Sequence, residues 1–259
     1  MELNIRSFGE GNPVIIFHGL LGSLDNWISI SKILSKKNKV ILVDLPNHGK
    51  SYHTKKFSYQ KMSESIHNFL INNQIDNISI IGHSMGGKLA LNYVDNYKEH
   101  VNKLIIVDVA NKTYSSNRFD NVFKAINSID LDIISSRNQA SDIVNNLIPS
   151  VGERNFILKN LKRNDNGFVW APNIELLEKS IIEISSRIKL KQKITNQTLF
   201  LFGKESTYYN NNDILNLSHD FENFYFKLVP GSGHWIHAEN PKAFINYTTE
   251  FLKLEDEKN

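Results

Sequence analysis

Short runs dominated by apolar residues alternate along this chain with longer stretches in which apolar residues recur at every third or fourth position. The short runs cover residues 13–17, 40–43, 78–81, 104–107, 198–202 and 224–229. Runs of this kind are typical of parallel strands that are buried on both faces. Helical spacing predicts covering helices at 27–34, 62–70, 89–97 and 244–251. We therefore predict an α/β fold with a mostly parallel central sheet flanked by helices.

The stretch between residues 111 and 195 follows a different pattern. It contains no run typical of a strand, and its apolar residues fall at helical spacing around 119–126 and 177–188. Strand-like runs then resume at residue 198, so this stretch interrupts the sheet instead of following it. We expect a core domain made of residues 1–110 and 196–259, with a helical cap, or lid, inserted at 111–195.

Composition excludes several functional classes. The chain has 259 residues, of which 41% are hydrophobic and 22% charged, as in an ordinary globular protein. It has no cysteine, which excludes disulfides, thiolate nucleophiles and cysteine metal sites. The net charge is +3, but the lysines are scattered and form no basic cluster of the kind that binds nucleic acid. We therefore expect no nucleic-acid partner.

The lengths of the apolar runs bear on whether the chain contains a membrane-spanning helix. No run reaches the eighteen or more apolar residues that a membrane-spanning helix needs. The first six residues lack the basic and apolar regions of a signal peptide. We expect a cytoplasmic protein without a membrane span.

The most specific chemical pattern lies at residues 78–87, where an apolar run is followed by Gly-x-Ser-x-Gly and then by a helical pattern. A strand that turns into a helix at Ser84 leaves no room for side chains two residues on either side, which explains Gly82 and Gly86. The new helix would begin at Met85 and point its N–H groups toward an oxyanion. We predict that Ser84 is a nucleophile, the alternative being a glycine-rich turn with an incidental serine.

A serine hydroxyl is a weak nucleophile near neutral pH and needs a base that is oriented by a carboxylate. We expect His234 to be that base, because it follows the last predicted strand in a Gly-x-Gly-His loop. His83 is expected to point away from the site, and His237 lacks the glycine-loop setting. His18 is expected to be a hydrogen-bonded structural residue.

Polar candidates share one position relative to the predicted strands. Each lies just past the carboxyl end of a predicted strand: His18, Asp44, Ser84, Asp108 and His234. Ligands of parallel sheets bind at this edge. The pattern therefore predicts that these side chains gather at one edge of the sheet.

Four segments together carry a resemblance to a known family. They are Gly82-His83-Ser84-Met85-Gly86-Gly87, the stretch from His18 to Asn26, the stretch from Asp44 to Ser51, and Gly231-Ser232-Gly233-His234-Trp235. The chain resembles the serine esterases of the α/β-hydrolase superfamily, and more narrowly the small bacterial esterases of the YbfF type. The resemblance runs nearly end to end and includes Arg118-Phe119-Asp120 in the expected cap. It implies the α/β-hydrolase fold.

The catalytic acid is the point at which this chain departs from most of the superfamily. The acid usually follows the strand that ends here at Gly203, yet the loop at 204–207 contains no aspartate. The resemblance to the YbfF type implies that Asp108 is the acid and that Ser206 is a supporting hydroxyl. Glu205 is the alternative acid, and loop capping is the alternative role for Asp108.

The same resemblance assigns the oxyanion hole to two backbone N–H groups, those of Leu20 and Met85. We expect Asp44 and Ser51 to order loops, the alternative being a catalytic role. Trp27, Trp170 and Trp235 are expected to pack in the core or cap, the alternative being stacking on the substrate. Arg118 is expected to be solvated, the alternative being contact with an anionic group of the substrate.

These expectations combine into a serine hydrolase of carboxylic esters or acyl thioesters, which uses no cofactor and no metal. Its partner would be a small acyl ester or thioester. One alternative is a C–C bond hydrolase or lyase of the same fold, and another is a non-catalytic ligand-binding member. The sequence leaves the acyl chain length, the choice between ester and thioester, and the oligomeric state open.

Overall fold

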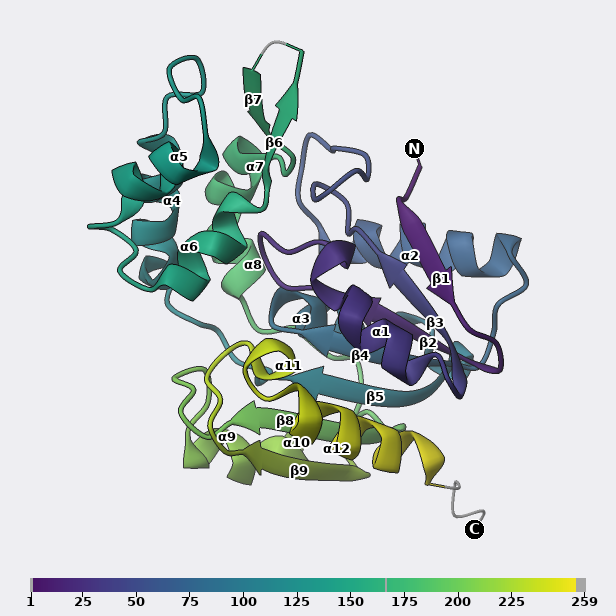
Figure 1. Ribbon diagram of the computed structural model, residues 1–259. Coiled ribbons are helices and arrows are strands. Elements are labelled where there is room, and N and C mark those ends of the chain that lie inside the picture. Colours follow the sequence, from purple (N-terminus) through teal and green to yellow (C-terminus); the bar gives the residue numbers. More distant parts are fainter. Residues whose placement is uncertain (1, 166, 255–259) are drawn as a thin grey trace.

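The computed structural model describes residues 2–165 and 167–254, and its largest element is a seven-stranded sheet (Figure 1). Across the sheet the strands are β1 (Ile5–Phe8), β3 (Asn38–Val43), β2 (Asn12–Phe17), β4 (Ile78–His83), β5 (Val101–Val107), β8 (Gln197–Gly203) and β9 (Phe224–Val229). Strand β1 runs antiparallel to β3, and the other neighbouring pairs in this sheet are parallel. The predicted mostly parallel sheet is confirmed.

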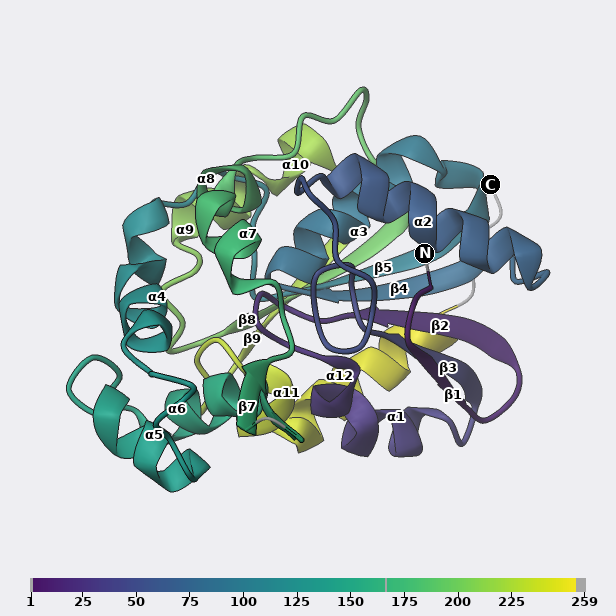
Figure 2. The ribbon, with the colours of Figure 1, turned by 90° about the horizontal axis from the view of Figure 1, so that it is seen from above.

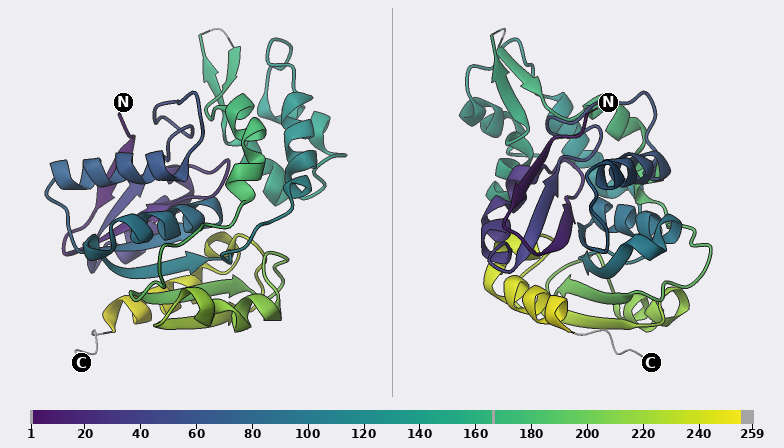
Figure 3. Two further views of the ribbon diagram at one scale, coloured as in Figure 1. Left: turned by 180° about the vertical axis from the view of Figure 1, so that it is seen from behind. Right: turned by 90° about the vertical axis from the view of Figure 1, so that its right-hand side faces the viewer.

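Helices cover both faces of this sheet, as Figure 2 and the right-hand view of Figure 3 show. One face is covered by α1 (Ile28–Leu34) and α12 (Pro241–Lys253), and the other by α2 (Tyr59–Asn72) and α3 (Met85–Asn96). Alternate residues of each strand point to opposite faces, and both sets are buried: Ile16 packs in the layer of α1, while Ile15 and Phe17 pack in the layer of α2 and α3. This two-sided burial explains the lack of polar alternation in the strands.

Shorter helices occupy the connections of the core. They are η1 (Leu24–Trp27), η2 (Lys98–His100), α9 (Asn211–Leu215), α10 (Leu217–Asp220) and α11 (Ile236–Glu239). Within the described parts of the chain, no helix combines the length and the apolar character that crossing a membrane requires.

The segment 111–195 forms a separate group at one end of the sheet (Figures 1 and 3). It contains η3 (Ser116–Phe119), α4 (Asp120–Asn127), α5 (Arg137–Val144), α6 (Val151–Leu158), α7 (Ile174–Lys179) and α8 (Ile181–Ser185). It also contains an antiparallel hairpin of β6 (Leu161–Asn164) and β7 (Gly167–Trp170).

The expectation of a purely helical segment was therefore wrong. The Asn-Asp-Asn-Gly sequence at 164–167 is typical of a hairpin turn and was the available signal. Each strand is only four residues long, which is too short for alternation to stand out from the helical pattern around it. Leu161 and Phe168 bury one side of the hairpin against the rest of the segment.

Close packing at the glycines of the 78–87 turn yields a stability prediction. A methyl group added to Gly86 would lie 2.2 Å from the carbonyl oxygen of Phe17, which is backbone and cannot rotate away. We expect Gly86→Ala to lower the free energy of unfolding by about 2–3 kcal/mol, as measured by chemical denaturation. Gly152→Ala is the matched control, because its methyl group would meet only the Ser150 hydroxyl, at 3.9 Å. Equal losses in both variants would contradict this account of the turn.

Candidate active site

The register of the sheet brings Ser84 and Asp108 to the same edge. Strands β4 and β5 pair His83 with Val107, so Ser84 and Asp108 are the next residues of two neighbouring strands. The Ser84 N–H donates to the Val107 carbonyl at 3.0 Å, and the Asp108 N–H donates to the Leu201 carbonyl at 2.8 Å. The pairing of strands, more than any local motif, therefore places these two side chains together.

Both residues have backbone conformations that non-glycine residues rarely adopt. Ser84 has φ 54° and ψ −118°, and helix α3 begins at the next residue, Met85. Asp108 has φ 50°. Each such conformation costs on the order of 1–3 kcal/mol, and strained residues of this kind cluster at functional sites. The sharp strand-to-helix turn predicted from the glycine spacing is present.

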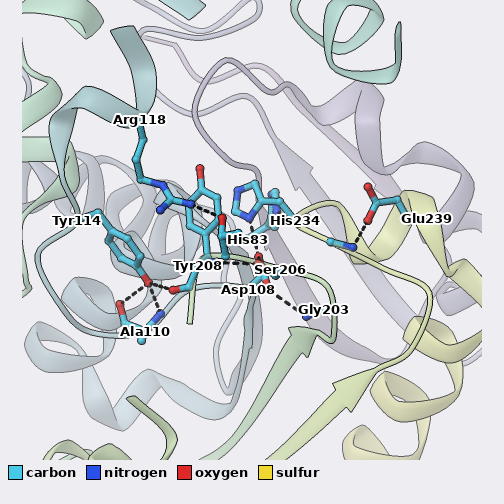
Figure 4. A network of polar contacts seen from close by, with 12 residues as sticks. His83, Asp108, Ala110, Tyr114, Arg118, Gly203, Ser206, Tyr208, His234 and Glu239 are labelled. Atoms are coloured by element: carbon cyan, nitrogen blue, oxygen red, sulfur yellow. Dashed lines mark hydrogen bonds and ion pairs between the residues drawn. The ribbon is translucent and has the colours of Figure 1, made fainter. Parts of the chain in front are cut away.

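Asp108 is fully buried and lies at the centre of a hydrogen-bond network (Figure 4). Its Oδ2 accepts from His234 Nδ1 at 2.7 Å and from the Ser206 hydroxyl at 2.5 Å, and its Oδ1 accepts from the Gly203 N–H at 2.9 Å. A carboxylate only accepts hydrogen bonds, so the Nδ1 of His234 carries the proton. In the neutral imidazole, Nε2 is consequently the nitrogen that can accept a proton.

The loop at 230–235, which carries His234, is held at several points. Glu205 accepts hydrogen bonds from two backbone N–H groups of the loop, at 3.2 and 2.6 Å, and Glu239 accepts a third at 2.6 Å. His83 Nε2 donates to the His234 carbonyl at 2.8 Å, and burial holds the pKa of His83 well below its usual value. Of the two carboxylates weighed as the acid, Asp108 bonds the imidazole, whereas Glu205 bonds the backbone of its loop.

The other histidines weighed as bases are packed into the core. His18 Nε2 accepts from the Leu45 N–H at 3.0 Å, and its Nδ1 donates to the Gly19 carbonyl at 2.8 Å. Burial lowers the pKa of His18 to about 4. His237 stacks on the ring of Trp27 with 4.0 Å between centroids, and burial lowers its pKa to about 3. These rings serve the structure, as was predicted for His18.

Asp44 orders the loops at this edge of the sheet, which is the role that was predicted for it. Its carboxylate accepts from the backbone N–H groups of Leu24 and Lys50 and from the side chain of Asn4. The Ser51 hydroxyl donates to the Asp44 carbonyl at 2.5 Å. Neither side chain lines the cavity described next.

A cavity of about 400 Å³ lies beside Ser84 and His234. The segment 111–195 contributes four apolar side chains to its wall: Phe119, Val122, Phe156 and Ile157. Among residues 2–165 and 167–254, no group of three or more His, Asp or Glu side chains is arranged to hold a metal ion.

Two residues near this cavity have contacts beyond those that were expected. Arg118 is exposed, as was expected, and its guanidinium lies 4.2 Å from the centroid of the Tyr208 ring and donates to the Thr207 hydroxyl at 2.6 Å. Trp235 packs on Phe156 of the segment 111–195, in line with the expected packing role, and it also lines the cavity together with Arg118. Both residues owe these positions to segments distant in sequence, which a local pattern does not report.

Sequence reasoning missed Tyr208 and Glu153. The Tyr208 ring stacks on His234 with 3.6 Å between centroids and 10° between planes, so it fixes the orientation of the imidazole. Glu153 brings a carboxylate to the cavity wall, and burial raises its pKa. Tyr208 lies in a loop without periodicity, and Glu153 occupies an ordinary polar position of α6, so neither carried a signal.

Leu20 and Met85, whose backbone N–H groups were expected to form the oxyanion hole, lie beside Ser84. A methyl group on Gly19 would be 3.3 Å from Ser84 Cβ, so the chain at 19–20 packs against the turn. Leu20 and Met85 line a small cavity together with Ser84. Over the described residues, neither N–H donates to a protein acceptor. Unpaired N–H groups at this place are what an oxyanion hole requires.

Comparison with known proteins identifies the family to which the fold belongs. A family model described as alpha/beta hydrolase fold matches residues 12–132. The chain is 30% identical to the esterase YbfF of Escherichia coli (strain K12), over 97% of this chain and 99% of that protein. The chain belongs to the α/β-hydrolase superfamily.

Other relatives of this α/β-hydrolase carry related names. It is 29% identical to the sn-1-specific diacylglycerol lipase ABHD11 of Danio rerio, over 95% of this chain and 80% of that protein. The solved structure of a marine microorganism esterase superposes with a TM-score of 0.93 at 38% identity, covering 96% of this chain and 99% of that one. Relatives named esterase and lipase support a hydrolase of the ester type.

Proposed function

We propose that this α/β-hydrolase cleaves carboxylic esters or acyl thioesters through an acyl-enzyme on Ser84. One observation carries the proposal: His234, with its Nδ1 bonded to the buried Asp108, lines the same cavity as Ser84. A serine, a histidine and a carboxylate in this relation are the parts that acyl transfer needs.

The reaction would proceed in two steps. Ser84 Oγ attacks the acyl carbon while His234 Nε2 takes the hydroxyl proton and then gives it to the leaving alcohol or thiol. The N–H groups of Leu20 and Met85 stabilise the oxyanion, and Asp108 stabilises the imidazolium. Water, activated by His234, then releases the acyl group and restores Ser84.

Ser206 has a supporting role in this scheme. Its hydroxyl donates to the same Asp108 oxygen that accepts from His234, so it holds that oxygen in place. Its own position is fixed by the Tyr208 N–H, which donates to it at 3.1 Å. The hydroxyl therefore stabilises the charged form of the acid without contacting the substrate.

We also propose that residues 111–195 form a cap on a core made of residues 1–110 and 196–259. Support comes from the apolar side chains of this segment that line the cavity beside Ser84, among them Phe119 and Phe156. The cap would exclude water and shape the acyl site.

A substrate panel tests the proposed function. We expect turnover of p-nitrophenyl esters or acyl thioesters of graded chain length, with a burst from acyl-enzyme formation, and labelling of Ser84 by a fluorophosphonate. Labelling without turnover of any ester or thioester, together with cleavage of a dicarbonyl substrate, would favour the C–C hydrolase. Neither labelling nor turnover would point to a non-catalytic member.

A further inference from the structure

Lys88 lies on α3, four residues after Ser84, and it is only 2% exposed. Lysine is rarely buried to this degree, because taking an ammonium group out of water is costly unless every proton finds an acceptor. Lys88 has no part in the reaction proposed above.

The partners of this ammonium come from both ends of the segment 111–195. Lys88 Nζ donates to the Lys112 carbonyl at 2.7 Å, where the segment begins. It also donates to the carbonyls of Ser185 and Ser186, at 2.8 and 2.5 Å, where α8 ends and the chain returns toward the core. These three bonds use all three protons of the ammonium, so a single side chain ties both connections of the segment to the helix that starts at the nucleophile.

The acceptors are groups that would otherwise be unsatisfied. The last carbonyls of a helix have no partner within it, and α8 ends at Ser185. Burial, with the neighbouring Lys112, lowers the pKa of Lys88 to about 7. The Tyr114 N–H also donates to the Ser185 carbonyl at 2.9 Å, so the outgoing and returning connections contact each other directly.

Lys88 also lies close to the candidate nucleophile Ser84. It lines the small cavity that Ser84 shares with Phe119 and Ser185. Phe119 lines the large cavity as well, next to Ser84 and His234. A shift of the two connections would therefore move the apolar wall relative to the nucleophile.

We propose that Lys88 is a positioning residue that fixes the segment 111–195 over Ser84 and thereby sets the substrate-binding shape of the large cavity. The expected effect on KM rests on the proposed function. The fixing of the segment 111–195 by Lys88 does not. Loss of the ammonium lowers the population of the binding-competent arrangement, and apparent affinity falls with that population.

The test compares Lys88→Met with Tyr59→Phe. Methionine keeps a straight apolar chain and removes all three hydrogen bonds. Tyr59→Phe removes one buried hydrogen bond to the same end of α8, that of the Tyr59 hydroxyl to the Ile184 carbonyl at 2.8 Å, and leaves the tie between the connections intact. We expect Lys88→Met to raise KM for esters about 10-fold or more, with kcat within about threefold of the wild type. KM of Tyr59→Phe should stay within about twofold of the wild type.

Hydrogen exchange supplies a readout that does not depend on activity. The amide of Tyr114 bonds across the two connections, and it should exchange about 10-fold faster or more in Lys88→Met, but not in Tyr59→Phe. If the wild type cleaves no ester, the proposed function fails, while faster exchange would still support the anchoring role.

Two outcomes would overturn the inference. One is a folded Lys88→Met protein with unchanged KM and unchanged exchange at Tyr114. The other is loss of folding in both Lys88→Met and Lys88→Gln under conditions in which Tyr59→Phe folds, because Lys88 would then be required by the core and not by the placement of the segment.

Discussion

Replacing Ser84 with alanine is expected to reduce ester hydrolysis by up to ~10⁶-fold, because the triad acts as a unit and alanine offers no nucleophile. The measurement is kcat/KM on the best ester of the panel. Alanine retains the Cβ atom, so the backbone at φ 54° is strained as before and the thermal midpoint should change little.

A fluorophosphonate provides the control for this variant. The probe reacts with activated serines, so it should label the wild type and leave Ser84→Ala unlabelled. Hydrolysis by Ser84→Ala at a rate near that of the wild type would show that Ser84 is not the nucleophile.

Asp108→Asn is expected to lower kcat on the order of 10⁴-fold. The introduced amide can donate to His234 Nδ1, which would move the imidazole proton to Nε2 and remove the base. The amide would also lack the negative charge that stabilises the imidazolium. The measurement is kcat on the same ester, with circular dichroism to verify the fold.

Two neighbouring variants test whether the effect belongs to Asp108. Ser206→Ala removes one hydrogen bond to the charged carboxylate and should lower kcat about 10-fold. Glu205→Gln alters only the hydrogen bonds that hold the backbone of the 230–235 loop, and it should lower kcat less than about 10-fold. If Glu205→Gln proved more damaging than Asp108→Asn, Glu205 would be the acid.

Much of this arrangement could be predicted because its causes are local. Apolar runs buried on two faces specify the strands of the central sheet. The hairpin at 161–170 was not predicted, because its four-residue strands are too short to give such a run. The turn at Ser84 was equally accessible, because Gly82 and Gly86 are required by contacts within a few residues and with the adjacent strand. The position of Asp108 after a strand was equally accessible, but its role as the acid was indicated only by the resemblance to the YbfF type.

Contacts between distant segments could not be predicted in this way. Asp108 and His234 are 126 residues apart, and they meet because β8 pairs with β5, which precedes Asp108, and with β9, which precedes the loop of His234. Tyr208 packs on His234 because of how a loop after β8 folds back, and no spacing in the sequence reports that contact.

The burial of Lys88 likewise depends on contacts with distant segments. Its polar side chain in a helical pattern would ordinarily be assigned to solvent, yet it is buried beneath carbonyls of residues 112, 185 and 186. The sequence by itself determined the strands, the strand-to-helix turn and the candidate nucleophile and base, since these depend on burial and sterics between near neighbours. The tertiary structure alone decided which carboxylate bonds the base, what stacks on it and what anchors the segment above it, because those contacts depend on the pairing of segments far apart in the chain.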